Sequence, residues 1–104
     1  SSDAYVNIVG GMKLKETAND LGVVMAIVSS YKNRPIDEKT IVFGEVGLSG
    51  EVRAVSMVEN RIAEAKKLRF ETCVIPEVSK QVIKNMTGIK IIGVKNISDA
   101  IHLI

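Results

Sequence analysis

Cysteine, histidine, proline and aromatic residues are scarce in this sequence of 104 residues. There is one cysteine, one histidine and no tryptophan, with two tyrosines and two phenylalanines. Cys73 has neither a partner for a disulfide nor a second thiolate for zinc, so we expect a small buried hydrophobic residue and no metal site. Four aromatic side chains are too few for a platform on which nucleic-acid bases would stack.

Long apolar runs and a strong charge of one sign are also missing. No stretch is long enough to cross a bilayer and no signal-peptide pattern opens the chain, so we expect a cytoplasmic protein without a membrane partner. The net charge of +2 is too small to indicate a polyanion partner by itself. With 46% hydrophobic and 25% charged residues, the composition is that of one globular domain spanning residues 1–104. Because a strand pattern begins almost at once, we expect a fragment of a longer protein.

Hydrophobic periodicity predicts strands that alternate with helices. The predicted strands cover residues 4–9, 41–43, 51–55, 72–75 and 90–94. The predicted helices are a buried one at 21–28 that ends near 30–32, an amphipathic one after Ser56 that reaches Leu68, and two short ones at 78–84 and 97–103. This order favours an α/β (α+β) fold, in which a mixed β-sheet and a β-hairpin are covered by helices.

Local signals mark where three of these helices begin and where the hairpin turns. Three pairs of polar residues have the spacing of helix N-terminal caps, in which two side chains satisfy free backbone N–H groups. They are Thr17 with Asp20, Ser56 with Glu59, and Asn96 with Asp99. Ser49-Gly50 supplies a tight turn between strands 41–43 and 51–55, which we expect to form the hairpin.

Residues 40–55, TIVFGEVGLSGEVRAV, resemble the GE(I/V)xLxGxV hairpin of Lon proteolytic domains. The similarity continues through RIAEAKKL at 61–68 and VIP at 74–76. VNIVGGMKL at 6–14, FGEVGL at 43–48 and Gly93-Val94 are more specifically similar to the Lon-protease-like C-terminal domain of the bacterial DNA-repair protein RadA (Sms). The resemblance implies a Lon proteolytic-domain-like fold and a C-terminal fragment of a RadA-type protein.

In the family that these residues resemble, the domain follows a zinc finger and a RecA-type ATPase, and the parent is a DNA-dependent ATPase or helicase. The resemblance therefore implies self-association into a hexameric ring, contact with duplex or single-stranded DNA, and ATP, Mg and Zn bound only in the part N-terminal to this chain. A G-x-x-x-x-G-K-[ST] motif and a cysteine-rich finger are absent from the sequence. We expect no cofactor in this domain.

Lon-type peptidases use a serine nucleophile and a lysine base, and the resemblance places these two positions at Ala18 and Glu59. Alanine carries no nucleophile, so we expect no catalytic residue and no enzymatic activity in this domain. Ser29 and Ser30 remain as hydroxyls near the end of the first helix. Neither has a histidine or lysine at a defined spacing, which argues against an activated serine.

Four cations are expected around the vacated catalytic cleft in the family arrangement, namely Lys13, Lys15, Arg53 and Arg61. We predict that they contact DNA phosphates without reading the base sequence. Arg53 and Arg61 are expected to face solvent. The resulting function is a proteolytically inactive scaffold for oligomerisation with a DNA-contacting surface, in an ATP-dependent repair and recombination motor.

Two other functions stay open on the sequence. One is an active Ser-Lys peptidase of the Lon type, against which Ala18 and Glu59 speak. The other is a Lon-like domain of the magnesium-chelatase/ComM type, a non-proteolytic branch in which the domain lies at the N-terminus of its parent.

Overall fold

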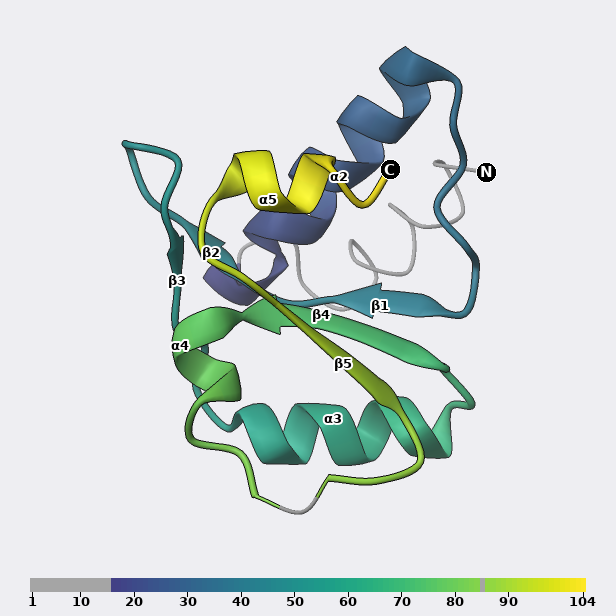
Figure 1. The fold of residues 1–104 in the computed structure, drawn as a ribbon, viewed down its shortest axis with the longest axis vertical. Coiled ribbons are helices and arrows are strands. Elements are labelled where there is room, and N and C mark those ends of the chain that lie inside the picture. The colour runs from purple at the N-terminus through teal and green to yellow at the C-terminus, as the bar shows by residue number, and fades with distance from the viewer. Residues whose placement is uncertain (1–15, 85) are drawn as a thin grey trace.

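The computed structural model describes residues 16–84 and 86–104 (Figure 1). The strand predicted at 4–9 lies outside these residues, as do Lys13 and Lys15. The described strands form a three-stranded parallel sheet, in the order β1 (Thr40–Val42), β4 (Thr72–Pro76) and β5 (Lys90–Val94), and a separate antiparallel pair, β2 (Glu45–Val46) and β3 (Val52–Arg53). Helices pack on both faces of the parallel sheet, so the α+β fold class is confirmed.

The central strand β4 divides the core into two layers. Cys73, Val74 and Ile75 are all buried, as expected for a central parallel strand that is covered on both faces. Val74 packs with Leu21 and Met25 on one face, whereas Cys73 and Ile75 pack with residues of α3 (Val58–Lys67) on the other. Cys73 is 0% exposed, which confirms it as a core residue, and this burial raises the pKa of its thiol to about 12.

The helix predicted at 21–28 is α2 (Asp20–Lys32), and a 3-10 turn, η1 (Thr17–Asn19), leads into it. Met25 is 1% exposed but Ile27 is 63% exposed, so the prediction of a buried helix is confirmed for one side of α2 and was wrong for the other. The Thr17–Asp20 cap was wrong too, because neither η1 nor α2 has a side-chain cap. The Asp20 carboxylate instead accepts a hydrogen bond from the Val46 N–H at 3.2 Å.

The hairpin differs from the prediction in its first strand. Residues 41–43 belong to the parallel side of the structure, where the Phe43 N–H donates to the Val74 carbonyl, and the hairpin consists of β2 and β3. The Gly50 N–H donates to the Gly47 carbonyl, and Gly50 has a φ of 81°, which suits glycine. The turn therefore lies where Ser49-Gly50 predicted it.

The remaining helices begin as their local contacts dictate. At the start of α3, Met57 occupies the cap position with a φ of 54° and no side-chain cap, so the predicted Ser56–Glu59 capping box was wrong. The helix predicted at 78–84 is the shorter α4 (Glu77–Lys80). The last helix, α5 (Ile97–Ile101), has the predicted cap, because the Asp99 N–H donates to the Asn96 side chain at 2.8 Å.

The one-sided burial of α2 predicts unequal effects of truncating two of its apolar side chains. Met25→Ala should lower the free energy of unfolding by about 2–5 kcal/mol, because it leaves a cavity in the core. Ile27→Ala should change it by less than about 0.5 kcal/mol, because that side chain is already in water. Urea unfolding of both variants checks this, and equal losses would show that the orientation of α2 is wrong.

Candidate functional site

A pocket of about 300 Å³ lies between the start of η1, the hairpin and the first turns of α3. Its lining residues are Glu16, Thr17, Ala18, Glu45, Ala54, Val55, Ser56 and Arg61. Ala18, where the resemblance places the nucleophile, is thus part of its wall. The pocket is the place in the described chain where the vacated catalytic cleft was expected.

Gly44 fixes the wall on the Ala18 side. Its N–H donates to the Ala18 carbonyl and its carbonyl accepts from the Leu21 N–H, both at 2.9 Å. A Cβ on Gly44 would lie 3.0 Å from Val52 Cγ1 and 3.1 Å from Leu21 Cβ, so a side chain does not fit without displacing one of these neighbours. The close approach that glycine permits therefore holds η1 against the end of β1.

The two positions of the family's dyad have different surroundings. Ala18 is 3% exposed and offers only a methyl group to the pocket. Glu59 is exposed in the first turn of α3 and is not among the lining residues. A methyl group therefore occupies the position that the resemblance assigns to the nucleophile, and Glu59 contributes no carboxylate to the pocket lining.

Arg61 is built into the pocket wall. Its Nε donates to the Ser56 carbonyl at 2.8 Å, its Nη2 forms an ion pair with Glu16, and its guanidinium carbon lies 5.6 Å from the centroid of the Phe43 ring. The side chain is only 21% exposed, so the prediction that it faces solvent was wrong. No pattern in the sequence indicates the Glu16 partner, because 45 residues separate it from Arg61.

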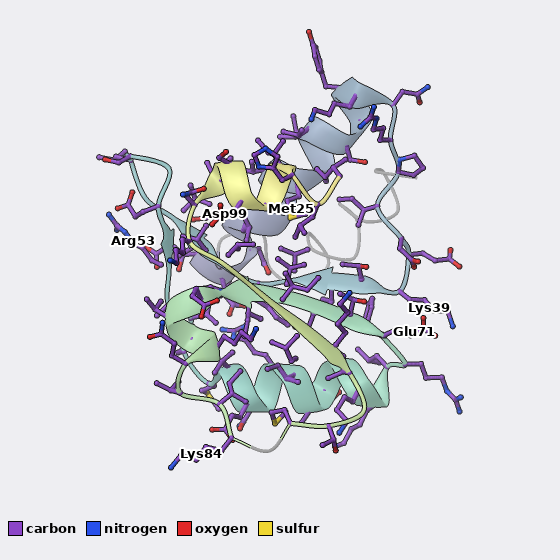
Figure 2. All side chains as sticks on the ribbon, viewed as in Figure 1. Met25, Lys39, Arg53, Glu71, Lys84 and Asp99 are labelled. Carbon is purple, nitrogen blue, oxygen red and sulfur yellow. The ribbon has the colours of Figure 1, made fainter. Side chains whose placement is uncertain are left out.

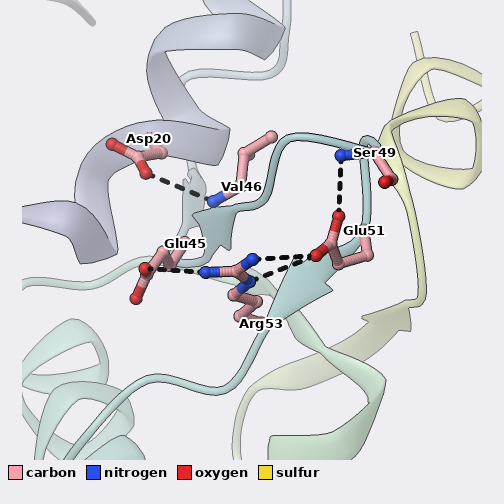
Figure 3. A network of polar contacts seen from close by, with 6 residues as sticks. All are labelled: Asp20, Glu45, Val46, Ser49, Glu51 and Arg53. Atoms are coloured by element: carbon pink, nitrogen blue, oxygen red, sulfur yellow. Dashed lines mark hydrogen bonds and ion pairs between the residues drawn. The ribbon is translucent and has the colours of Figure 1, made fainter.

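Arg53 does face solvent, but carboxylates on the hairpin hold it (Figure 3). Its Nη2 lies 3.0 Å from Glu51 Oε2 and its Nη1 lies 3.7 Å from Glu45 Oε1. Glu51 also accepts from the Ser49 N–H at 3.0 Å. Two hydrogen bonds hold the pKa of Glu51 below its usual value. The one from its own backbone N–H has the larger effect, and the one from the Arg53 side chain adds to it. These contacts tie β3 to the turn and to β2.

Within the described residues, no hydrogen bond joins the hydroxyl of Ser29 or Ser30 to a histidine or lysine side chain that could act as a base. Ser29 is buried and its hydroxyl donates to the Arg34 carbonyl, whereas Ser30 is exposed. The Ser29 hydroxyl thus stabilises the turn that follows α2.

Residues 16–84 and 86–104 offer neither a cluster of metal ligands nor a membrane-spanning helix. These residues include no group of three histidine, cysteine, aspartate or glutamate side chains able to hold a metal ion. Among the helices of the same ranges, none is both long enough and apolar enough to span a membrane.

Comparison with known proteins gives consistent matches. The family model described as subunit ChlI of Mg-chelatase matches residues 3–79. The DNA repair protein RadA of Escherichia coli K12 is 44% identical over 101 residues, and that of Bacillus subtilis 168 is 43% identical over 102 residues. RadA of Aquifex aeolicus is 43% identical over 102 residues. The alignments cover 97% of this chain for E. coli and 98% for the other two, and 22% of each relative, so the chain spans about a fifth of their length.

The different burial of the two arginines predicts different contributions to stability. Arg61→Met should lower the free energy of unfolding by about 1–3 kcal/mol, because it removes a charge-assisted hydrogen bond and leaves Glu16 without its cation. Arg53→Met should cost no more than about 1 kcal/mol, because solvent screens its ion pairs. Denaturant unfolding of the two variants measures the difference, and a larger loss for Arg53→Met would contradict this assignment.

Proposed function

The chain belongs to the family described as subunit ChlI of Mg-chelatase and is homologous to the DNA repair protein RadA. We propose that it is a proteolytically inactive, Lon-protease-like part of a RadA-type DNA-repair motor. In that motor it acts as a scaffold for oligomerisation and as a sequence-independent contact surface for DNA. The observation that carries the proposal is the pocket that Ala18 lines without offering a nucleophile.

Inactivity follows from the chemistry of acyl transfer. A peptidase of this kind needs a nucleophile within hydrogen-bond reach of a base. Ala18 provides no reacting atom, Glu59 lies outside the lining, and Arg61 is engaged by Ser56 and Glu16. These contacts favour an inactive domain over a working Ser-Lys peptidase.

Because the chain spans about a fifth of its relatives, the motor itself is assigned to the parent protein. We propose that the N-terminal part of the parent protein binds ATP, Mg and Zn. Residues 1–104 form the C-terminal part of each subunit, and six subunits form a cytoplasmic ring. A ring of identical subunits needs two different surfaces that complement each other. Leu48 at the hairpin turn and Tyr31 near the end of α2 are exposed apolar side chains on separate elements, at 106% and 91%, which supports such a contact.

The description of the matching family model favours a second candidate, a non-proteolytic domain of the magnesium-chelatase/ComM type. The order of segments in the parent protein separates the two. A zinc finger and an ATPase that precede this domain support the RadA-type function, whereas a Lon-like domain at the N-terminus of the parent supports the second candidate.

Deleting the segment that corresponds to residues 16–104 from the full-length parent tests the proposed role. We expect the deletion to lower the number of subunits per particle, measured by mass photometry. We also expect weaker binding of labelled duplex DNA and a smaller dependence of that binding on salt, because phosphate contacts release counterions. A truncated parent that keeps its ring and its salt dependence would contradict both roles.

A further inference from the structure

We propose that the cations contacting DNA phosphates lie at the N-terminal edge of the parallel sheet, in a basic edge formed by Lys66, Lys67, Arg69 and Lys90, and not at Arg53 and Arg61. This inference rests on the proposed contact with DNA and identifies the surface that makes it. The basic edge lies at the end of the sheet where α3 finishes and where β4 and β5 begin.

Backbone contacts bring the four residues of the basic edge together. The Phe70 N–H donates to the Ala65 carbonyl at 3.0 Å, which turns the chain from α3 into β4. The Lys90 N–H donates to the Glu71 carbonyl at 2.9 Å, which sets the start of β5 beside the start of β4. The Lys66 side chain crosses the loop before β5, since a Cβ on Gly88 would lie 3.2 Å from its Cε and 3.4 Å from its Nζ.

The charges of the basic edge are available to a ligand, in contrast to those of Arg53 and Arg61. All four of its residues are exposed, and no acidic residue within 16–84 or 86–104 forms an ion pair with any of them. Glu71, the acid on this edge, pairs with Lys39 at 3.7 Å (Figure 2). Arg53 and Arg61 would have to leave carboxylates that they already contact.

Arg69 occupies a backbone position that favours glycine. Its φ is 69°, and its N–H donates to the Lys66 carbonyl at 3.0 Å in the hydrogen-bond pattern that commonly ends a helix. Glycine is the usual residue there because a side chain strains the left-handed conformation. No hydrogen bond or ion pair of the Arg69 side chain within the described residues offsets this strain, so its charge is free to bind a ligand.

DNA phosphate is the ligand that these side chains fit. Lysine and arginine side chains bind phosphate oxygens without reading bases. Phe70 is the aromatic residue of the turn from α3 into β4, and it is half-buried, so base stacking is not supported. The basic edge is therefore suited to the backbone of DNA of any sequence.

The competing explanation is that the cations merely complement the partial negative charge at the C-terminal end of α3. The variant Arg69→Gly separates the two, because it removes a cation and at the same time relieves the strained backbone. If the charge serves DNA, this variant should bind DNA more weakly without a loss of thermal stability. If the charge serves the helix alone, DNA binding should not change.

The test uses the full-length parent oligomer and a labelled duplex of random sequence, titrated by fluorescence anisotropy at several salt concentrations. We expect Arg69→Gly to reduce the slope of log affinity against log salt by about one unit, and Lys66→Glu with Lys67→Glu to reduce it by about two. Arg53→Glu is the matched control on the hairpin and should leave the slope unchanged. The melting temperature of Arg69→Gly should not fall.

Three other outcomes would overturn the inference in distinguishable ways. If the unaltered parent does not bind DNA, the proposed function itself fails. If it binds and only Arg53→Glu reduces the slope, DNA is contacted at the hairpin. If Arg69→Gly lowers the melting temperature and leaves the slope intact, the basic edge serves only to stabilise α3.

Discussion

The close backbone approach at Gly44 is the constraint on which the arrangement of the site depends. Its two backbone hydrogen bonds, to Ala18 and Leu21, join the start of α2 to the segment between β1 and the hairpin. The absence of a side chain lets Leu21 and Val52 pack against the same point. A single residue thus links the helix that covers one face of the sheet, the sheet itself and the hairpin.

The pocket follows from this junction and does not need a catalytic role to exist. Ala18 is held in its wall by the bond to Gly44, and Arg61 closes another part through Ser56 and Glu16. The guanidinium of Arg61 is thus engaged within the wall by the Ser56 carbonyl and the Glu16 carboxylate. The pocket is therefore a consequence of this packing, and exposed cations without an ion pair in residues 16–84 and 86–104 lie elsewhere, among them those at the end of α3.

The sequence predicted the parts of the fold that depend on neighbours along the chain. The strand predicted at 90–94 and the cap at Asn96 depend on local patterns, and both were confirmed. The strand predicted at 72–75 was also found, and it extends one residue further, to Pro76. The first hairpin strand was misplaced because an apolar run does not indicate which strand it pairs with. Here β1 pairs with β4 and not with the next segment, and Thr72, the partner of Thr40, lies 32 residues further along the chain. The burial of Arg61 was missed for the same reason, since its partner Glu16 is distant in sequence.

Hydrolysis of unfolded casein by the full-length parent tests whether this domain lacks peptidase activity, as we propose. The variant that carries Ala18→Ser and Glu59→Lys serves as a comparison, because it restores both side chains of the dyad while Glu59 lies outside the pocket lining. The account predicts no casein cleavage above background by either protein. Sustained cleavage by the unaltered protein that survives repeated purification would contradict it.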